Sequence, residues 1–232
     1  MRTENIAVVV VGGGSAAFEA AVAAKQAGAP KVVMLEKAPE PEFGGNARYS
    51  HTGFRWVFSG ADEIRRFLPE LDDATFQKLN LPAYSSELFH ADLQRVTRGR
   101  VDRTLTDVLV SQSNAAIHWM RELGIKWEID SHVVIDGRYY FEPGLVIHPV
   151  GGVGGGLGQL AQWREIALGM GVDLRYESRV KALMATTAIS RAWLFRTPVK
   201  NTKSRAGRSY FVPADFKPMR KCAPAISAPT PI

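Results

Sequence analysis

The sequence predicts an α/β fold with a parallel central sheet, and three features near its start carry this prediction. Residues 6–11 (IAVVVV) form a continuous apolar, mostly β-branched run, typical of a strand buried on both faces. Residues 15–27 are rich in alanine and are followed by Gly28, a natural end for a helix. Residues 31–35 (KVVML) then predict a second strand. Strand, turn, helix and strand within about thirty residues make a βαβ unit.

The rest of the chain predicts further elements from its apolar spacing and its turn residues. In order, we expect a long loop at 39–60, short helical pieces within 62–101, a helix at 104–123, a hairpin turning at Asp136-Gly137, a glycine-rich turn at 151–158, a helix at 158–169 and a strand at 172–176 that continues toward Val180.

The turn after the first strand has the spacing G-x-G-x-x-G/A, filled by Gly12, Gly14 and Ala17. The first glycine permits a tight turn, the second lets a pyrophosphate approach the backbone, and the small third residue lets helix and strand pack closely. Glu36 ends the second strand, where a carboxylate can accept both ribose hydroxyls of an adenosine. We therefore predict a Rossmann-like, dinucleotide-binding unit. The alternative is a plain glycine turn with a solvated carboxylate at Glu36.

Composition limits the class of protein. Apolar residues make up 46% and charged residues 22%, as in ordinary globular proteins. No apolar run is long enough for a membrane span or a secretion signal, so we expect a cytoplasmic protein. The single cysteine, Cys222, excludes an internal disulfide and a site with several cysteine ligands. The five histidines show no metal-ligand spacing, so we expect no metal.

The positive charge of the chain lies in its tail. The net charge is +6, but residues 1–183 carry −2 and residues 184–232 carry +8, with Asp215 as the only acid in the tail. The tail also contains the only cysteine and one of the 21 glycines. The sharpest change in composition therefore falls near Met184.

Four stretches point to a known family: VVVVGGGSAAFEAAVAAKQAGAPKVVMLEKAP with the following GGNARYSHTG, then NAAIHWMRELGIKWE, HPVGGVGGGLGQLAQW and GVDLRYESRVKAL. Together, over residues 6–183, they resemble the flavoprotein family of fumarate reductases and succinate dehydrogenases (FAD-binding 2 type). The nearer branch is the one that contains tricarballylate dehydrogenase and the 3-ketosteroid dehydrogenases. The resemblance implies a Rossmann-like FAD-binding domain with a parallel central sheet, truncated, with a partial substrate-side insertion.

The resemblance also implies roles for individual residues. Fourteen residues would contact FAD: for the pyrophosphate Gly12, Gly14, Ser15 and Ala16; for the ribose Glu36, flanked by Lys37; along the pyrophosphate and ribityl chain Gly44, Gly45, Asn46 and Ala47; near the flavin ring Ser50, Thr52 and Gly53; and for the adenine the backbone of Val180. The groups that hold substrate and transfer a proton in the family have no counterpart in the tail as written. We therefore assign no catalytic residue.

Two histidines lie next to residues of this expected site. Ser50-His51-Thr52 is similar to the covalent flavin attachment site of membrane-bound succinate dehydrogenases, but the Gln-Gly-Gly that should follow is missing. We therefore interpret His51 as a loop histidine and expect noncovalent FAD. His148 precedes the second glycine turn, where relatives place groups that contact substrate, and a surface histidine with satisfied hydrogen bonds is the alternative.

The tail changes character when it is read one base out of frame. If each codon is rebuilt from the last base of one codon and the first two of the next, residues from Ser209 onward permit VVLCAGGFQANAEMRARYLGPNAD, which resembles the family's next core strand, glycine turn and helix. Residues 184–208 permit a β-hairpin segment in the same way. We infer a frameshift of one base near Leu183. The alternatives are a disordered basic tail and a nucleic-acid arm, although the tail shows no repeat or helical face.

These inferences combine into one functional hypothesis. We expect an FAD-dependent dehydrogenase or reductase that acts on a carbon–carbon bond of a small carboxylic acid or ketosteroid-like substrate, without nucleic acid or membrane partners. Under this hypothesis the chain as written is a truncated and inactive piece of such an oxidoreductase. The alternative is a protein whose role is not catalytic, either an FAD-binding fragment or a pseudoenzyme. We expect four segments: 1–61 (βαβ unit and flavin loop), 62–145 (substrate-side segment), 146–183 (return to the FAD-binding domain) and 184–232 (disordered, frameshifted tail).

Overall fold

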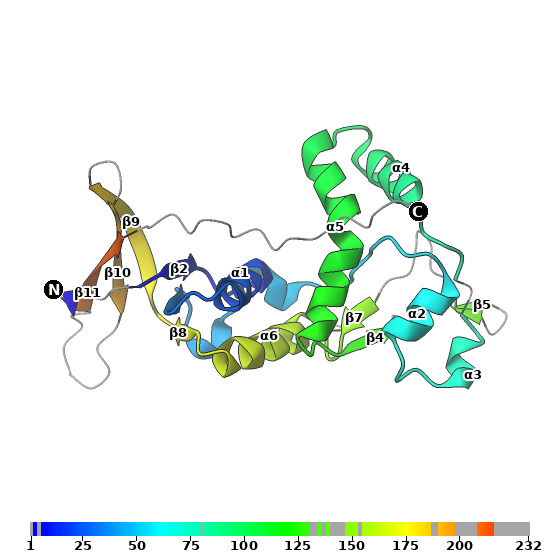
Figure 1. Ribbon diagram of the computed structural model, residues 1–232, viewed down its shortest axis with the longest axis horizontal. Helices are drawn as coiled ribbons and strands as arrows, with labels where there is room; N and C mark the ends of the chain where they lie inside the picture. The colour runs from blue at the N-terminus through cyan, green and yellow to red at the C-terminus, as the bar shows by residue number, and fades with distance from the viewer. Residues whose placement is uncertain are drawn as a thin grey trace. The chain divides into compact units, whose positions relative to one another are not determined.

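The computed structural model (Figure 1) describes residues 2–3, 6–79, 81–129, 134–135, 138–139, 147–152, 155–186, 190–197 and 208–215. The chain divides into two compact units, residues 1–46 with 163–232 and residues 47–162.

The first unit contains the predicted parallel sheet. Strands β2 (Val8–Val11), β3 (Val32–Leu35) and β8 (Asp173–Arg175) are parallel and adjacent in that order, with Val8 opposite Val32. Helix α1 (Ser15–Gln26) packs against β2 and β3. The helix buries Phe18, Ala21 and Val22, which lie on one face because they are spaced three and four residues apart. The predicted α/β fold with its βαβ unit is confirmed.

The two strands of that unit differ in burial. All four residues of β3 are buried, whereas the first three residues of β2 are half-buried and Val11 is 50% exposed. The prediction that the first strand is buried on both faces is therefore wrong. The physical reason is its place in the sheet: among the described residues β2 pairs only with β3, so it forms an edge.

A second sheet of the first unit includes part of the tail. Strands β9 (Arg179–Thr186), β10 (Ser190–Thr197) and β11 (Arg208–Asp215) are antiparallel neighbours, and β1 (Arg2–Thr3) pairs with β11 in parallel. The backbone of β10 and β11 is thus extended and hydrogen-bonded, where the composition predicts no regular structure. Aromatic residues favour extended backbone, and both strands contain them: Trp193 and Phe195 in β10, Tyr210 and Phe211 in β11. Residues 198–207 and 216–232 lie outside the described part of the chain.

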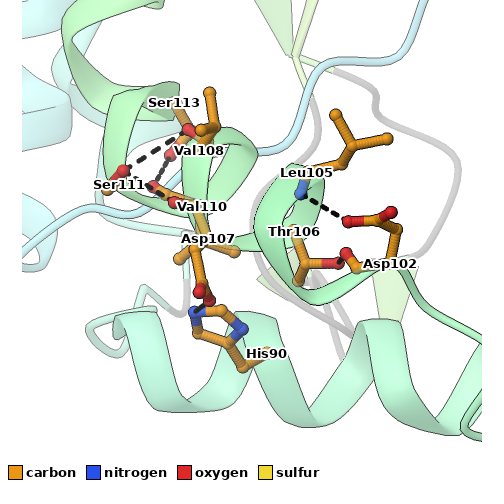
Figure 2. Close-up of polar contacts among 9 residues, drawn as sticks. All are labelled: His90, Asp102, Leu105, Thr106, Asp107, Val108, Val110, Ser111 and Ser113. Atoms are coloured by element: carbon orange, nitrogen blue, oxygen red, sulfur yellow. Dashed lines mark hydrogen bonds and ion pairs between the residues drawn. The ribbon is translucent and has the colours of Figure 1, made fainter.

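Helices dominate the second unit: α2 (Ala61–Phe67), α3 (Asp73–Phe76), α4 (Ser86–Thr97) and α5 (Arg103–Glu122). The sequence dictates where α5 begins, because the Asp102 carboxylate accepts the Leu105 N–H at 3.0 Å, a standard N-cap (Figure 2). His90 of α4 and Asp107 of α5 approach to 3.6 Å and join the two helices (Figure 2). The predicted helix at 104–123 is confirmed.

An aromatic core lies within the second unit. Trp56 packs against Phe58 and Phe67, and Phe67 packs against Trp127, with ring centroids 5.6–6.0 Å apart. The remaining elements of the chain are β4 (Trp127–Ile129) paired with β7 (Ile147–Pro149), the pair β5 (Val134–Ile135) and β6 (Arg138–Tyr139), the 3₁₀ helices η1 (Glu40–Glu42) and η2 (Gly45–Tyr49), and α6 (Leu157–Gly169).

The predicted hairpin is confirmed, because β5 pairs antiparallel with β6, although its turn residues 136–137 lie outside the described part. The predicted helix after the second glycine turn is also confirmed, as α6. The division between units falls at 46/47 and 162/163, whereas the sequence predicts boundaries at 61/62 and 145/146. The loop at 47–60 lies with the second unit because Phe54 pairs with Ile147 and Phe58 with Tyr84. None of the helices described is long and apolar enough to cross a membrane.

Candidate cofactor site

The glycine turn of the first unit leaves the start of α1 open to an anion. Gly12 adopts φ +118°, a conformation that glycine adopts without steric cost, and its N–H bonds the Leu35 carbonyl of the neighbouring strand at 2.9 Å. Gly14 is the N-cap and supplies no side-chain cap, and the first turn of α1 contains no acidic residue. No side chain of the first turn of α1 therefore compensates the positive end of the helix, which suits a phosphate.

Glu36 lies directly after β3 and is 5% exposed. Its N–H bonds the Arg175 carbonyl at 2.9 Å, which fixes the chain at the end of the sheet. One carboxylate oxygen accepts the Ala38 N–H at 2.7 Å. The other lies over Gly13, where a Cβ would be only 2.7 Å away from it. The structure thus assigns a role to Gly13 that the G-x-G spacing does not. The only signal in the sequence is that Gly13, between Gly12 and Gly14, is also a glycine.

A second pair of glycines meets the first turn. The Gly44 carbonyl lies 3.4 Å from the position a Cβ of Gly14 would take, so the two backbones approach closely. Gly44 and Gly45 both have positive φ, 113° and 53°. Gly45, Asn46 and Lys37 are exposed. Apart from Ala47, the residues expected to hold pyrophosphate and ribose therefore lie within the first unit.

Strand β9 contributes through its start. The Ser178 N–H donates to the Glu36 carbonyl at 2.7 Å, and Ser178 is fully buried. The side chain of Val180 packs against the cluster of Ile6, Val33 and Leu35. Val180 thus lies beside the Glu36 segment, half-buried, with its side chain against the core.

A polar and aromatic group flanks Glu36. Burial raises the pKa of the Tyr176 hydroxyl, although the nearby Arg164 guanidinium works against this rise. Arg164 also forms an ion pair with Glu40. The Tyr176 ring packs edge-on against Phe43 at 5.7 Å. No sequence pattern signals this group, because its members come from three separate segments.

The second unit contains the other part of the expected site. Ser50 and Gly53 are exposed, and Ala47 is half-buried. Thr52, by contrast, is buried, and its hydroxyl donates to the Gly152 carbonyl at 3.3 Å. The Thr52 side chain therefore points toward Gly152, while Ser50 and Gly53 lie on the exposed side of the loop.

The two histidines of this region contact one another. His148 is fully buried, its Nδ1 lies 2.7 Å from the His51 carbonyl oxygen, and the two rings meet edge-on at 4.8 Å. His148 is therefore not a surface histidine: it ties β7 to the loop. Within the described ranges, no group of three or more His, Cys, Asp or Glu residues could hold a metal ion.

The structure thus groups ten of the fourteen residues in the first unit and four in the second. Those of the first unit are Gly12, Gly14, Ser15, Ala16, Glu36, Lys37, Gly44, Gly45, Asn46 and Val180, and those of the second are Ala47, Ser50, Thr52 and Gly53. A βαβ unit with an open helix start and a buried acid at the end of the second strand defines a dinucleotide-binding domain.

Comparison with known proteins gives the family. Residues 7–187 match the FAD binding domain family, and the chain belongs to it. It is 27% identical over 176 residues to a fumarate reductase (cytochrome) of Shewanella frigidimarina, and 29% identical over 185 residues to the probable fumarate reductase Ifc3 of the same organism. These matches cover 76% and 78% of this chain but only 27% of each relative, so the chain spans about a quarter of their length.

Solved structures agree. The open conformation of a flavocytochrome c3 fumarate reductase aligns with a TM-score of 0.62 and 28% identity over 91% of this chain and 32% of that chain. The 3-ketosteroid-Δ4-(5α)-dehydrogenase of Rhodococcus jostii RHA1 aligns with a TM-score of 0.59 over 91% of this chain and 44% of its own; at 18% identity it shows the fold alone. The predicted membership of the fumarate reductase-like flavoproteins is confirmed.

Proposed function

We propose that this chain binds FAD noncovalently and forms the FAD-binding part of an oxidoreductase. The observation that carries the proposal is the arrangement of Glu36 and the glycine turn. A buried carboxylate at the end of β3 lies over Gly13, beside a helix start that has no side-chain cap and no acidic residue. These residues fit the adenosine and pyrophosphate part of FAD.

Each group of residues has a separate role in this proposal. The amides at the start of α1 bind the pyrophosphate, and Glu36 accepts the ribose hydroxyls. The exposed Gly45 and Asn46 continue along the cofactor, and Ser50 with Gly53 border the flavin ring. FAD, when bound, supplies a hydride acceptor or donor, and the protein orients it and excludes water.

The proposed reaction is oxidation or reduction at a carbon–carbon bond of a small carboxylic acid, such as fumarate or tricarballylate, or of a ketosteroid-like substrate. The similarity to fumarate reductases supports a small carboxylic acid as the substrate rather than a ketosteroid. Hydride transfer also needs a group that holds substrate against the flavin and a proton donor or acceptor within reach. We assign no such group in this chain, and we expect the 232-residue polypeptide alone to bind FAD without turnover.

Flavin extraction and an activity assay test both statements. The purified chain is loaded with FAD, desalted and precipitated with acid. We expect yellow flavin in the supernatant, because His51 lacks the Gln-Gly-Gly context of a covalent site. Flavin that stays with the precipitate would contradict noncovalent binding, and turnover of fumarate, tricarballylate or a ketosteroid would contradict the expected inactivity.

A further inference from the structure

Thr52 has a backbone conformation that is unusual for its residue type. In the described part of the chain, three residues other than glycine have positive φ: Thr52 at 50°, Arg98 at 55° and Glu177 at 52°. Arg98 is an exposed C-cap of α4, where this conformation is common, and Glu177 is exposed. Thr52 is β-branched and only 7% exposed. A β-branched residue is a true outlier in this region, and such conformations persist only where the surroundings impose them.

The surroundings that impose it are two glycines of the turn at 151–158. The Thr52 hydroxyl donates to the Gly152 carbonyl, and a Cβ at Gly152 would overlap Thr52 Oγ1. A Cβ at Gly156 would lie 3.0 Å from Thr52 Cγ2 and would overlap the Ala47 carbonyl oxygen. Both branches of the threonine side chain therefore occupy space that only glycine leaves open. The glycine turn is shaped to receive Thr52.

Thr52 is also the inward-facing residue of an outward-facing loop. Its neighbours Ser50, His51 and Gly53 are exposed. The Ser50 hydroxyl accepts the Thr52 N–H at 3.1 Å, so the turn at Thr52 is fixed from its own loop as well. On the opposite side, the Gly156 N–H donates to the Arg48 carbonyl at 3.1 Å. One buried side chain and one backbone bond thus hold residues 47–53 against the glycine turn, in addition to the contact of His148 in β7 with the His51 carbonyl.

We propose that Thr52 is a positioning residue for the cofactor: by filling the glycine turn it clamps the loop 47–53 and fixes the backbone and side chains that border the flavin. This inference rests on the proposed function. The cost of the left-handed conformation is offset by the hydroxyl and methyl contacts, and the result is a loop whose geometry is set before the cofactor arrives.

Three substitutions test whether Thr52 positions the loop or only adopts an unfavourable backbone conformation without a role. Thr52→Ser keeps the hydroxyl, Thr52→Val keeps the branched shape without a donor, and Thr52→Gly removes both contacts while accepting φ 50° at no steric cost. Arg98→Gly is the matched control, because it removes the other αL side chain of the second unit at an exposed helix end.

The first readout is hydrogen exchange of the flavin-free protein in peptides covering 47–56 and 155–163. We expect Thr52→Gly to speed exchange in both peptides by about tenfold or more, Thr52→Val to speed it less, and Thr52→Ser to stay within about threefold of wild type. The second readout is the FAD dissociation constant with the visible circular dichroism of the bound flavin. Thr52→Gly is expected to weaken FAD binding about tenfold and to change the spectrum. Thr52→Ser is expected to keep the wild-type affinity and the wild-type spectrum.

The outcomes are distinct. If Thr52→Gly matches wild type in hydrogen exchange and FAD affinity, or binds FAD more tightly, the proposal that Thr52 clamps the loop is wrong. If Arg98→Gly produces the same changes, they report lost αL side chains in general, and the clamp is again wrong. If the wild-type chain binds no FAD, the proposed function fails, and exchange in the flavin-free protein still decides whether Thr52 holds the loop.

Discussion

The carboxylate of Glu36 occupies the space that a side chain at Gly13 would need: a Cβ at Gly13 would lie 2.7 Å from Glu36 Oε2 and 3.2 Å from its Cγ. The middle glycine of the turn is therefore required by an acid 23 residues further along the chain. This contact joins the two halves of the nucleotide motif, the turn proposed to approach the phosphates and the acid proposed to bind the ribose.

The first prediction concerns Gly13. Gly13→Ala introduces a methyl group that pushes the Glu36 carboxylate aside, and overpacking of this kind costs about 1–3 kcal/mol of stability. We expect a lower urea midpoint and weaker FAD binding. Because φ of Gly13 is not positive, the effect isolates the lack of space. Gly169→Ala is the control, since nothing lies within 4 Å of a Cβ there. Equal effects of the two substitutions would refute the requirement.

The second prediction concerns the carboxylate itself. Glu36→Ala removes the acceptor for the Ala38 N–H and for the proposed ribose hydroxyls. Hydrogen bonds to charged groups contribute about 1.5–3 kcal/mol, so we expect FAD to bind at least about tenfold more weakly in a fluorescence titration. Glu42→Ala, which removes an exposed acid nearby in sequence, should leave affinity unchanged. If Glu36→Ala binds FAD like wild type, Glu36 does not hold the ribose.

Much of the first unit could be predicted from the sequence, for physical reasons. The β-branched runs before Gly12 and Glu36 favour strands, and the alanine-rich segment between them favours a helix, so local preferences and the final fold agree. Helix α5 is equally clear, because its apolar spacing is regular and Asp102 caps it.

Other features have no local signal. A buried threonine with positive φ is held by a turn a hundred residues away, and no propensity for threonine predicts it. The partial exposure of β2 arises because β3 is its only neighbour among the described strands. The apolar run at 6–11 does not reveal how many neighbouring strands it will have. Strands β10 and β11 form by antiparallel backbone pairing with each other and, for β10, with β9, and the change in composition near Met184 does not reveal this pairing.

The third prediction addresses the pH dependence of stability through Glu63 of α2. Partial burial opposes ionisation of Glu63, but hydrogen bonds from Ser59 and Asn114, with His118 nearby, hold the pKa of its carboxyl below the ordinary value of 4.5. Because the folded-state pKa is lowered, the ionised group stabilises the protein fully above the unfolded value. The contribution is lost as pH falls through the folded-state pKa.

The measurement is urea unfolding at several pH values. At pH 7, Glu63→Gln should lose up to about 1 kcal/mol relative to wild type, because solvent screens part of the interaction, and the difference should shrink as the pH falls below 4.5. Glu122→Gln, at an exposed position of α5, should show neither effect. A difference that stays constant down to strongly acidic pH would disagree with the lowered pKa.

The fourth prediction concerns the origin of the tail. We propose a frameshift of one base near Leu183. Three observations support it: the change in charge and glycine content near Met184, a family match that ends at residue 187, and an edge at β2 beside which an apolar strand such as VVLCAGG would pack. The gene sequence tests it. We expect the shifted frame to stay open through the VVLCAGG segment, and early stop codons in that frame would disprove the frameshift.

A repaired gene extends the same test to the protein. Restoring one base near codon 183 should give a polypeptide with tighter FAD binding and a higher urea midpoint than the 232-residue chain, because the added strand would bury the half-exposed residues of β2. A repaired protein with unchanged stability would argue against the missing strand.

The most direct test of the central claim is a calorimetric titration of the purified chain with FAD, with FMN as the comparison. FMN carries the flavin and one phosphate but lacks the adenosine that Glu36 and the glycine turn are proposed to hold. We predict saturation at one FAD per chain and binding of FMN at least about a hundredfold weaker, equivalent to about 2.7 kcal/mol. Saturation by FMN with the affinity of FAD, or no saturable heat with FAD, would contradict the assignment of this unit as the adenosine-binding half of an FAD site.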